Sequence, residues 1–136
     1  VIAYCWIHGQ RTALAHRLRR LDPDWHAPVL WRSELRNILT GYRRDGSLDA
    51  SQVRQIMAAA EAGLSGREHY IPSERVFRVT EQSRLSAYDS EFVALAEILG
   101  ARLVTEDRAI LAAFPQHAMD VEGAVGGGAF GLPLTP

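Results

Sequence analysis

The sequence has no lysine, only one cysteine and no long hydrophobic run. Because Cys5 has no second cysteine to pair with, an internal disulfide is excluded and a reducing compartment such as the cytoplasm is favoured. The apolar stretch from Val1 to Ile7 is much shorter than the roughly 20 residues of a membrane span. It also lacks the basic flank and the cleavage site of a secretory signal. We therefore expect a cytoplasmic protein that does not enter a membrane.

The absence of lysine leaves arginine to supply all 15 basic side chains. One explanation is GC-rich codon usage; the other is phosphate recognition, because the planar guanidinium group matches phosphate oxygens. The formal net charge is −1, so the molecule as a whole does not attract nucleic acid. Local groups of arginines are still compatible with an RNA-facing surface: Arg17, Arg19 and Arg20, and Arg32, Arg36, Arg43 and Arg44.

Short apolar runs alternate with amphipathic helical patterns along the 136 residues. We expect helices over residues 12–21, 31–44, 49–63, 73–83, 86–99 and 107–114, and short strands over residues 27–30, 70–71, 102–105 and 118–121. This alternation is typical of an α/β fold. The prediction is a three-layer sandwich with a parallel central sheet flanked by helices.

The composition predicts one domain over residues 1–121 and a flexible Gly- and Pro-rich tail over residues 122–136. The tail contains the pattern G-x-G-x-x-G at residues 126–131, which binds dinucleotides when it links a strand to a helix. No strand is expected before it and no helix after it, so we interpret it as a chance match. The histidines show no paired metal-binding spacing, and there is no G-x-S-x-G nucleophile elbow.

Three carboxylates stand out because of their positions in the predicted elements. Asp107 follows a predicted strand, Glu34 lies one turn into a helix that follows another strand, and Asp89 lies in the first turn of the clearest helix. Parallel sheets bind ligands beyond the carboxyl ends of their strands. Carboxylates from distant parts of a chain repel one another unless a cation holds them. This set predicts a Mg²⁺ or Mn²⁺ site in preference to a zinc site.

Each carboxylate also has a purely structural explanation. Glu34 could be an exposed side chain paired with an arginine. Asp89 lies three residues after Ser86, as in a capping box, and Asp107 occupies the position of a helix N-cap. The metal site is therefore predicted from the three residues together and from none of them alone.

Three segments in order carry a further signal: WRSELRNIL from Trp31, SAYDSEFVALAE from Ser86 and LVTED from Leu103. They closely resemble the PIN-domain ribonucleases and, within that family, the VapC-type toxins of bacterial toxin–antitoxin pairs. The family places four acidic residues at one edge of a parallel five-stranded sheet. The resemblance maps the second, third and fourth of these to Glu34, Asp89 and Asp107, and it matches Thr105 to a hydroxyl residue beside the fourth.

The resemblance implies a Mg²⁺- or Mn²⁺-dependent endoribonuclease that hydrolyses RNA phosphodiester bonds as the toxin of a type II toxin–antitoxin system. Glu34, Asp89 and Asp107 would hold the metal, and Thr105 would orient a ligand or a water. The implied partners are a structured RNA such as tRNA, a second copy of the chain in a homodimer, and an antitoxin protein that covers the site.

One departure from the family is that its first strand, which ends in the first acidic residue, would precede Val1 and is absent here. We therefore expect an N-terminally truncated PIN-like domain that is weakly active or inactive. Loss of a central strand exposes backbone groups and apolar surface on its neighbours. The alternative function is a non-catalytic PIN-like module that binds an antitoxin or RNA without cutting it.

Overall fold

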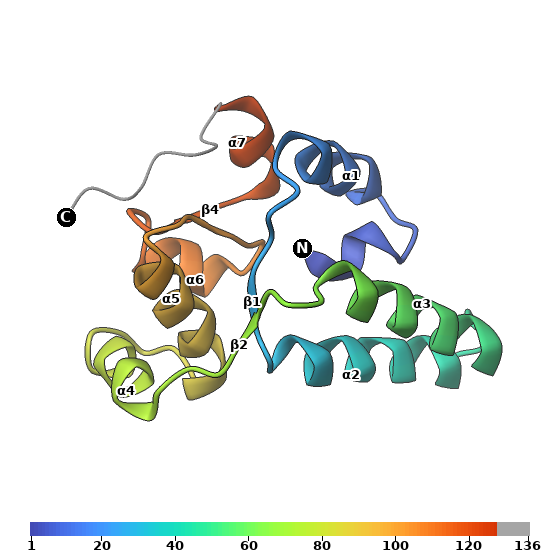
Figure 1. Ribbon diagram of the computed structural model, residues 1–136, viewed down its shortest axis with the longest axis horizontal. Helices are drawn as coiled ribbons and strands as arrows, with labels where there is room; N and C mark the ends of the chain where they lie inside the picture. Colours follow the sequence, from blue (N-terminus) through green and yellow to red (C-terminus); the bar gives the residue numbers. More distant parts are fainter. Residues whose placement is uncertain (128–136) are drawn as a thin grey trace.

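The computed structural model describes residues 1–127 (Figure 1). In chain order the elements are the 3₁₀ helix η1 (Ile2–Cys5), α1 (Thr12–Leu21), β1 (Ala27–Pro28), α2 (Trp31–Arg44), α3 (Ala50–Gly63), β2 (Glu68–His69), α4 (Ser73–Glu81), α5 (Ala87–Leu99), β3 (Leu103–Val104), α6 (Arg108–Ala113), β4 (Ala118–Met119) and α7 (Val121–Gly126). Helix α7 covers the start of the predicted tail. Residues 128–136, and with them most of the G-x-G-x-x-G match, lie outside the described part of the chain.

The prediction of a three-layer sandwich around a parallel central sheet is wrong. The structure is 60% helical and contains two separate sheets of two parallel strands, β1 with β2 and β3 with β4. Each strand is only two residues long. Within residues 1–127 no strand joins β1 to β3, and the apolar segment at the start of the chain forms η1 instead of a strand. Without a central strand the two pairs cannot make one sheet.

Among residues 1–127, strand β1 pairs with β2 on one side and has no partner strand on the other. Ala27 and Val29 donate their backbone N–H groups toward β2, to the carbonyls of Arg67 at 3.1 Å and His69 at 2.9 Å. Because backbone groups alternate in direction along a strand, Pro28 between them faces the other way. Pro28 has no N–H to donate, which suits a strand at the edge of a sheet.

Among residues 1–127, strand β3 likewise pairs on one side only, with β4. Leu103 and Thr105 donate to the carbonyls of His117 at 2.8 Å and Met119 at 2.9 Å, which turns the backbone of Val104 away from β4. Val104 lines a cavity of about 900 Å³, and Pro28 of β1 lines the same cavity. The open edges of the two small sheets thus border one shared space.

The helices follow the local signals in the sequence closely. Asp49 caps α3 in a full capping box with Gln52. Ser86 caps α5, and Gly100 ends it in the left-handed conformation at φ 59°. Helix α4 begins as predicted at Ser73, but Ser73 is its first residue and forms no side-chain cap. Helix α7 was not predicted.

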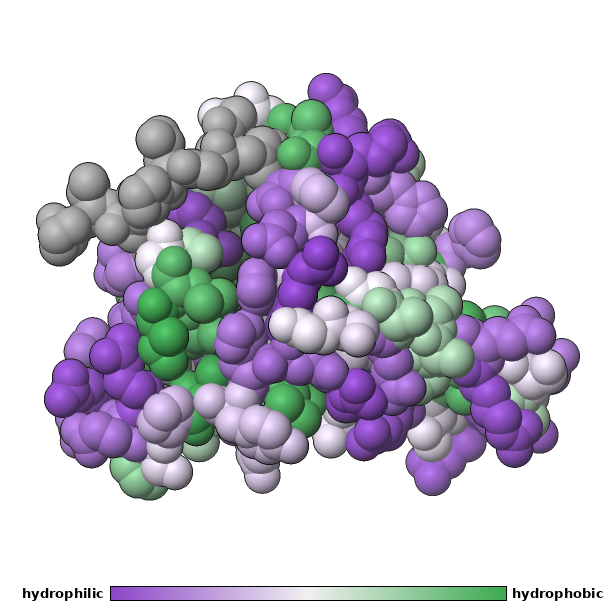
Figure 2. Space-filling view, in the orientation of Figure 1, coloured by the Kyte–Doolittle hydropathy of each residue, from purple (hydrophilic) through white to green (hydrophobic). Residues whose placement is uncertain are grey.

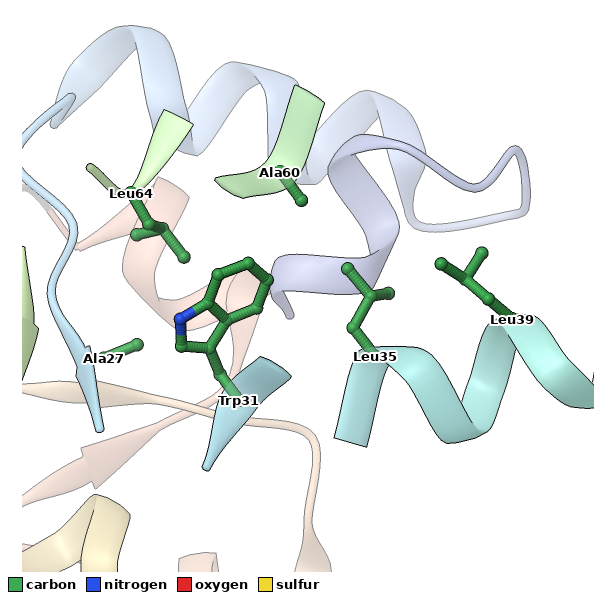
Figure 3. Close-up of a cluster of buried hydrophobic side chains, with 6 residues drawn as sticks. All are labelled: Ala27, Trp31, Leu35, Leu39, Ala60 and Leu64. Atoms are coloured by element: carbon green, nitrogen blue, oxygen red, sulfur yellow. The ribbon is translucent and has the colours of Figure 1, made fainter. Parts of the chain in front are cut away.

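Three hydrophobic clusters hold the elements together. The first packs α2 against α3 and β1 and consists of Ala27, Trp31, Leu35, Leu39, Ala60 and Leu64 (Figure 3). The second joins α4, α5, α6 and β4 through Val79, Val93, Ala94, Ile110, Phe114 and Ala118. The third joins α1 to α7 through Leu18, Val121 and Ala124. Apolar residues recur at helical spacing along α2, and three of them, Trp31, Leu35 and Leu39, are buried, whereas Ile38 and Tyr42 are 41% and 37% exposed.

A polar network fixes the start of α2 to β2. The indole Nε1–H of Trp31 donates to Glu68 Oε1 at 2.7 Å, and Arg32 donates to both carboxylate oxygens of Glu68, at 2.6 and 2.8 Å. Arg32 also pairs with Glu61 of α3 at 2.6 Å. Bidentate guanidinium–carboxylate pairs are among the stronger hydrogen-bonded contacts in proteins. Three elements are therefore locked around the first cluster.

The surface is uneven in character. Figure 2 shows hydrophilic side chains over the end where α2 meets α3, and an apolar area over α5. Ile98 and Leu99, at the end of α5, are 44% and 40% exposed. Within residues 1–127, every helix is too short or too polar to cross a bilayer.

Candidate functional site

All four residues predicted for the site line the 900 Å³ cavity. Glu34 comes from the first turn of α2, Asp89 from the first turn of α5, and Thr105 and Asp107 from the segment between β3 and α6. Three segments that are far apart in the sequence therefore contribute acidic side chains to the lining of one cavity. What each carboxylate can do depends on the contacts that it already makes.

Glu34 has no hydrogen-bond or ion-pair partner in the described part of the chain. The neighbouring Arg32 is occupied by Glu61 and Glu68, so the predicted alternative of a local arginine partner is not seen. Partial burial raises the pKa of the Glu34 carboxyl, and the negative charge of Asp89 raises it further. A carboxylate in these surroundings gains from any cation that reaches it.

Asp89 makes a local contact at the start of α5, and one of its carboxylate oxygens can still bind a ligand. Its backbone N–H donates to Ser86 Oγ at 3.0 Å, and the Ser86 hydroxyl donates to Asp89 Oδ2 at 2.8 Å. Half of the predicted capping box is thus present. In residues 1–127 the reciprocal contact from the Ser86 N–H to the carboxylate is not formed. Asp89 Oδ1 is left available to a ligand.

Asp107 is the N-cap of α6, as the structural explanation predicted. Its Oδ1 accepts from the N–H groups of Ala109 at 2.8 Å and Ile110 at 3.0 Å. Thr105 Oγ1 accepts from the Asp107 N–H at 3.1 Å and so fixes the turn before the helix. Both bonds to the carboxylate use Oδ1, which leaves Oδ2 free.

Of the two aspartates in the cavity, Asp89 is the one whose negative charge acts on Glu34. Asp89 contributes to the raised pKa of Glu34, and Asp107 does not. Within residues 1–127 no three His, Cys, Asp or Glu side chains are close enough to hold one metal ion. Mg²⁺ commonly takes one or two carboxylates and completes its shell with water. The donor chemistry of Glu34 and Asp89 fits that mode, and a three-carboxylate cage is not present.

Val1 is a neighbour of the site that the sequence patterns did not identify, and it lines the cavity with the four predicted residues. Glu106, which directly precedes Asp107, is a further acidic residue of the same segment. Glu106 itself is engaged elsewhere, because it accepts from the Val121 N–H at 3.0 Å and pairs with an arginine of the α1 region. Only its position beside Asp107 could have drawn attention to it in the sequence.

The arginines of the predicted RNA-facing groups divide into structural and exposed members. Arg19 lies between the rings of Trp6 and Trp25, at 5.2 and 5.6 Å from their centroids, and donates to the Gly63 carbonyl at 3.2 Å. Arg32 belongs to the network with Glu68. The exposed members are Arg17, Arg20, Arg36, Arg43 and Arg44. A surface for phosphate groups would therefore be built from these five.

Comparison with known proteins adds no family to this description. No family model matches the chain, and no curated protein matches it. The likeness of Trp31 to Leu39, Ser86 to Glu97 and Leu103 to Asp107 to PIN-domain ribonucleases thus stays a prediction from those three segments.

Proposed function

We propose that the protein is a Mg²⁺- or Mn²⁺-dependent endoribonuclease and the toxin of a type II toxin–antitoxin pair. The observation that supports this most is the shared cavity, which Glu34, Asp89 and Asp107 enter from three separate elements. Glu34 is partly desolvated beside a second carboxylate, an arrangement common in cation-binding sites. The choice of RNA as substrate rests on the resemblance of the three sequence segments.

Glu34 and Asp89 would hold the cation, with water in its other positions. When bound, the cation lowers the pKa of a coordinated water and offsets negative charge on the phosphoryl oxygens. Ser86 holds the Asp89 carboxylate through Oδ2, and two backbone N–H groups hold Asp107 through Oδ1. The free Oδ2 of Asp107 would orient a water molecule against the scissile phosphate.

The exposed arginines of α2, Arg36, Arg43 and Arg44, would neutralise phosphates on either side of the cut. A homodimer and a covering antitoxin are part of the same proposal. Exposed apolar side chains at Tyr70, Phe77 and Ile98 offer surface for such partners, with exposed fractions of 89%, 57% and 44%.

The first test combines Glu34→Gln with Asp89→Asn. Cleavage of a labelled RNA in Mg²⁺ or Mn²⁺ should fall by at least 100-fold, because both proposed ligands lose their charge. The rise in melting temperature on adding Mn²⁺ should also be lost, since binding to the folded state alone stabilises it. The melting temperature without metal should not fall, because Asn can still accept the Ser86 hydrogen bond and Glu34 loses an unfavourable charge.

Two control variants match these changes in chemistry but lie away from the cavity. Glu81→Gln removes the charge of an exposed glutamate of α4. Asp49→Asn removes the charge of an aspartate that makes a capping contact at the start of its helix, as Asp89 does. Both should keep full cleavage. Undiminished cleavage by the double variant at Glu34 and Asp89 would refute the proposed metal ligands.

The alternative is a non-catalytic module that binds RNA or an antitoxin. It is favoured by the absence, within residues 1–127, of three donors close enough to share one ion. Under this alternative the unmodified protein retains RNA on a filter, binding weakens steeply with salt, and no divalent cation produces cleavage. The nuclease proposal requires cation-dependent products from the same preparation.

A further inference from the structure

We propose that His26 and His69 bind a first-row transition-metal ion such as Zn²⁺, Ni²⁺ or Cu²⁺ through their ring nitrogens. His26 lines the same cavity as Glu34 and Asp89, but the proposed ligands are different side chains from the carboxylates of the proposed nuclease. His26 directly precedes β1, and His69 is the last residue of β2. Parallel pairing of these strands brings the two side chains together across 43 residues of sequence. No short-range histidine spacing could reveal this pair.

The two imidazoles meet through nitrogens that can both be metal ligands. Nδ1 of His26 and Nε2 of His69 are 2.9 Å apart, and their ring centroids are 5.1 Å apart. With metal–nitrogen bonds of about 2.0–2.1 Å, two ligands at a tetrahedral angle place their nitrogens about 3.3 Å apart. A small rotation of either ring would therefore open the pair enough to admit an ion. The His26 side chain is 28% exposed, so solvent reaches the site.

A second observation points to a ligand at the same place. Asp24 Oδ1 lies 3.4 Å from Nε2 of His26, the ring nitrogen that faces away from His69. Arg67 Nε holds the same carboxylate oxygen at 2.9 Å. Histidines that bind metals usually direct their other ring N–H at a carboxylate, which fixes the tautomer and raises the basicity of the ligand nitrogen. Asp24 lies near enough to His26 Nε2 to do this after a small rotation of either side chain, although at 3.4 Å the two form a charge contact and not a hydrogen bond.

The tautomers give a consistent account of the free and metal-bound pair. With Asp24 keeping a proton on Nε2 of His26, the Nδ1 lone pair of His26 accepts a hydrogen bond from His69. Metal binding needs the lone pair of His69 Nε2 as well, so His69 moves its proton to Nδ1. This exchange of tautomer releases no net proton.

Water would supply the remaining coordination positions. Within residues 1–127, no third His, Cys, Asp or Glu side chain joins the pair to form a three-donor group. Two imidazoles and water should prefer Cu²⁺ to Ni²⁺ and Zn²⁺, following the general order of divalent affinities. Mg²⁺, which prefers oxygen ligands, should not compete.

The test uses protein that carries no affinity tag. Cu²⁺ or Zn²⁺ is titrated into it, and binding is measured by isothermal titration calorimetry. We expect saturable binding of about one equivalent, with affinity reduced at least tenfold by His26→Gln or His69→Gln. Asp24→Asn should weaken binding about tenfold, as loss of a partner of a metal-bound histidine commonly does. The electron paramagnetic resonance spectrum of the Cu²⁺ complex should show two coupled nitrogens.

Matched controls separate this site from other histidines and from the proposed nuclease. His8→Gln changes an exposed histidine elsewhere, and Glu34→Gln with Asp89→Asn removes the carboxylate site; neither should alter Cu²⁺ or Zn²⁺ binding. Circular dichroism without metal checks that each variant is folded. The proposal is overturned if the unmodified protein shows no saturable binding, or if folded His26→Gln and His69→Gln variants bind as tightly as it does. It is also overturned if His8→Gln weakens binding as much as they do.

Discussion

At the scale of single residues, two glutamates experience opposite surroundings. Burial and the charge of Asp89 raise the pKa of Glu34, whereas the hydrogen bonds from Arg32 and Trp31 outweigh burial and lower the pKa of Glu68. A raised carboxyl pKa costs folding stability once the pH exceeds the unfolded value of about 4.3. A lowered pKa contributes stability above that value and loses it as the pH falls through the folded pKa.

Glu34→Gln should therefore raise the melting temperature at pH 7, by about 1–3 °C because solvent screens a partly exposed carboxylate. Glu68→Gln should lower it by about 3–6 °C, because Arg32 loses a charged partner. The Glu34 difference should disappear below about pH 4, where this carboxyl is protonated in the folded and the unfolded chain. The Glu68 difference should be lost only as the pH falls further, through the lowered folded pKa. A Glu34 effect that grows on acidification would contradict the assigned cause.

At the scale of secondary-structure elements, the position of a glycine decides whether its replacement by alanine raises or lowers the free energy of unfolding. Gly100 ends α5 at φ 59°, and Gly41 lies inside α2; an added Cβ would meet no atom within 4 Å at either place. Gly100→Ala should thus destabilise by about 1 kcal/mol from backbone strain alone. Gly41→Ala should stabilise by about 0.5–1 kcal/mol through helix propensity. Urea unfolding gives the change in the free energy of unfolding for each variant. Changes of the same sign in both variants would show that side-chain packing, and not backbone conformation, decides the effect.

The helices were predictable because their signals are local. Asp49, Ser86 and Gly100 mark helix ends through contacts with residues at most four positions away. The sheet was not predictable in this way, since strand pairing depends on distant segments and short apolar runs do not specify a partner. The strand expected at residues 70–71 lies instead at Glu68–His69, and Tyr70 is 89% exposed.

The candidate site likewise contains residues whose positions could be predicted from local sequence and residues whose positions could not. The positions of Asp89 and Asp107 at helix starts could be predicted from their neighbours, and both capping contacts are present. The location of Glu34 beside Asp89 required the fold, as did the meeting of His26 with His69. Side chains that meet across tertiary structure leave no periodic trace in the sequence.

At the scale of the whole molecule, the core is divided into three clusters, with a cavity of about 900 Å³ between the two sheets. Trp31 belongs to the first cluster, and Trp6 and Trp25 pack against it. Tryptophan fluorescence therefore reports mainly on the region of α2 and α3, whereas circular dichroism averages over all helices. We expect thermal unfolding midpoints from the two probes to differ by several degrees. Coincident transitions would show that the clusters unfold as one unit.

Pro28 makes the unpaired side of β1 a poor site for the addition of another strand. An unpaired strand edge is a template on which extended segments of other molecules can polymerise. At the centre of this edge the ring nitrogen has no hydrogen to offer, so an incoming strand would leave one of its carbonyls unsatisfied. Pro28 is also buried, so its surroundings in the fold keep other molecules away from this edge as well.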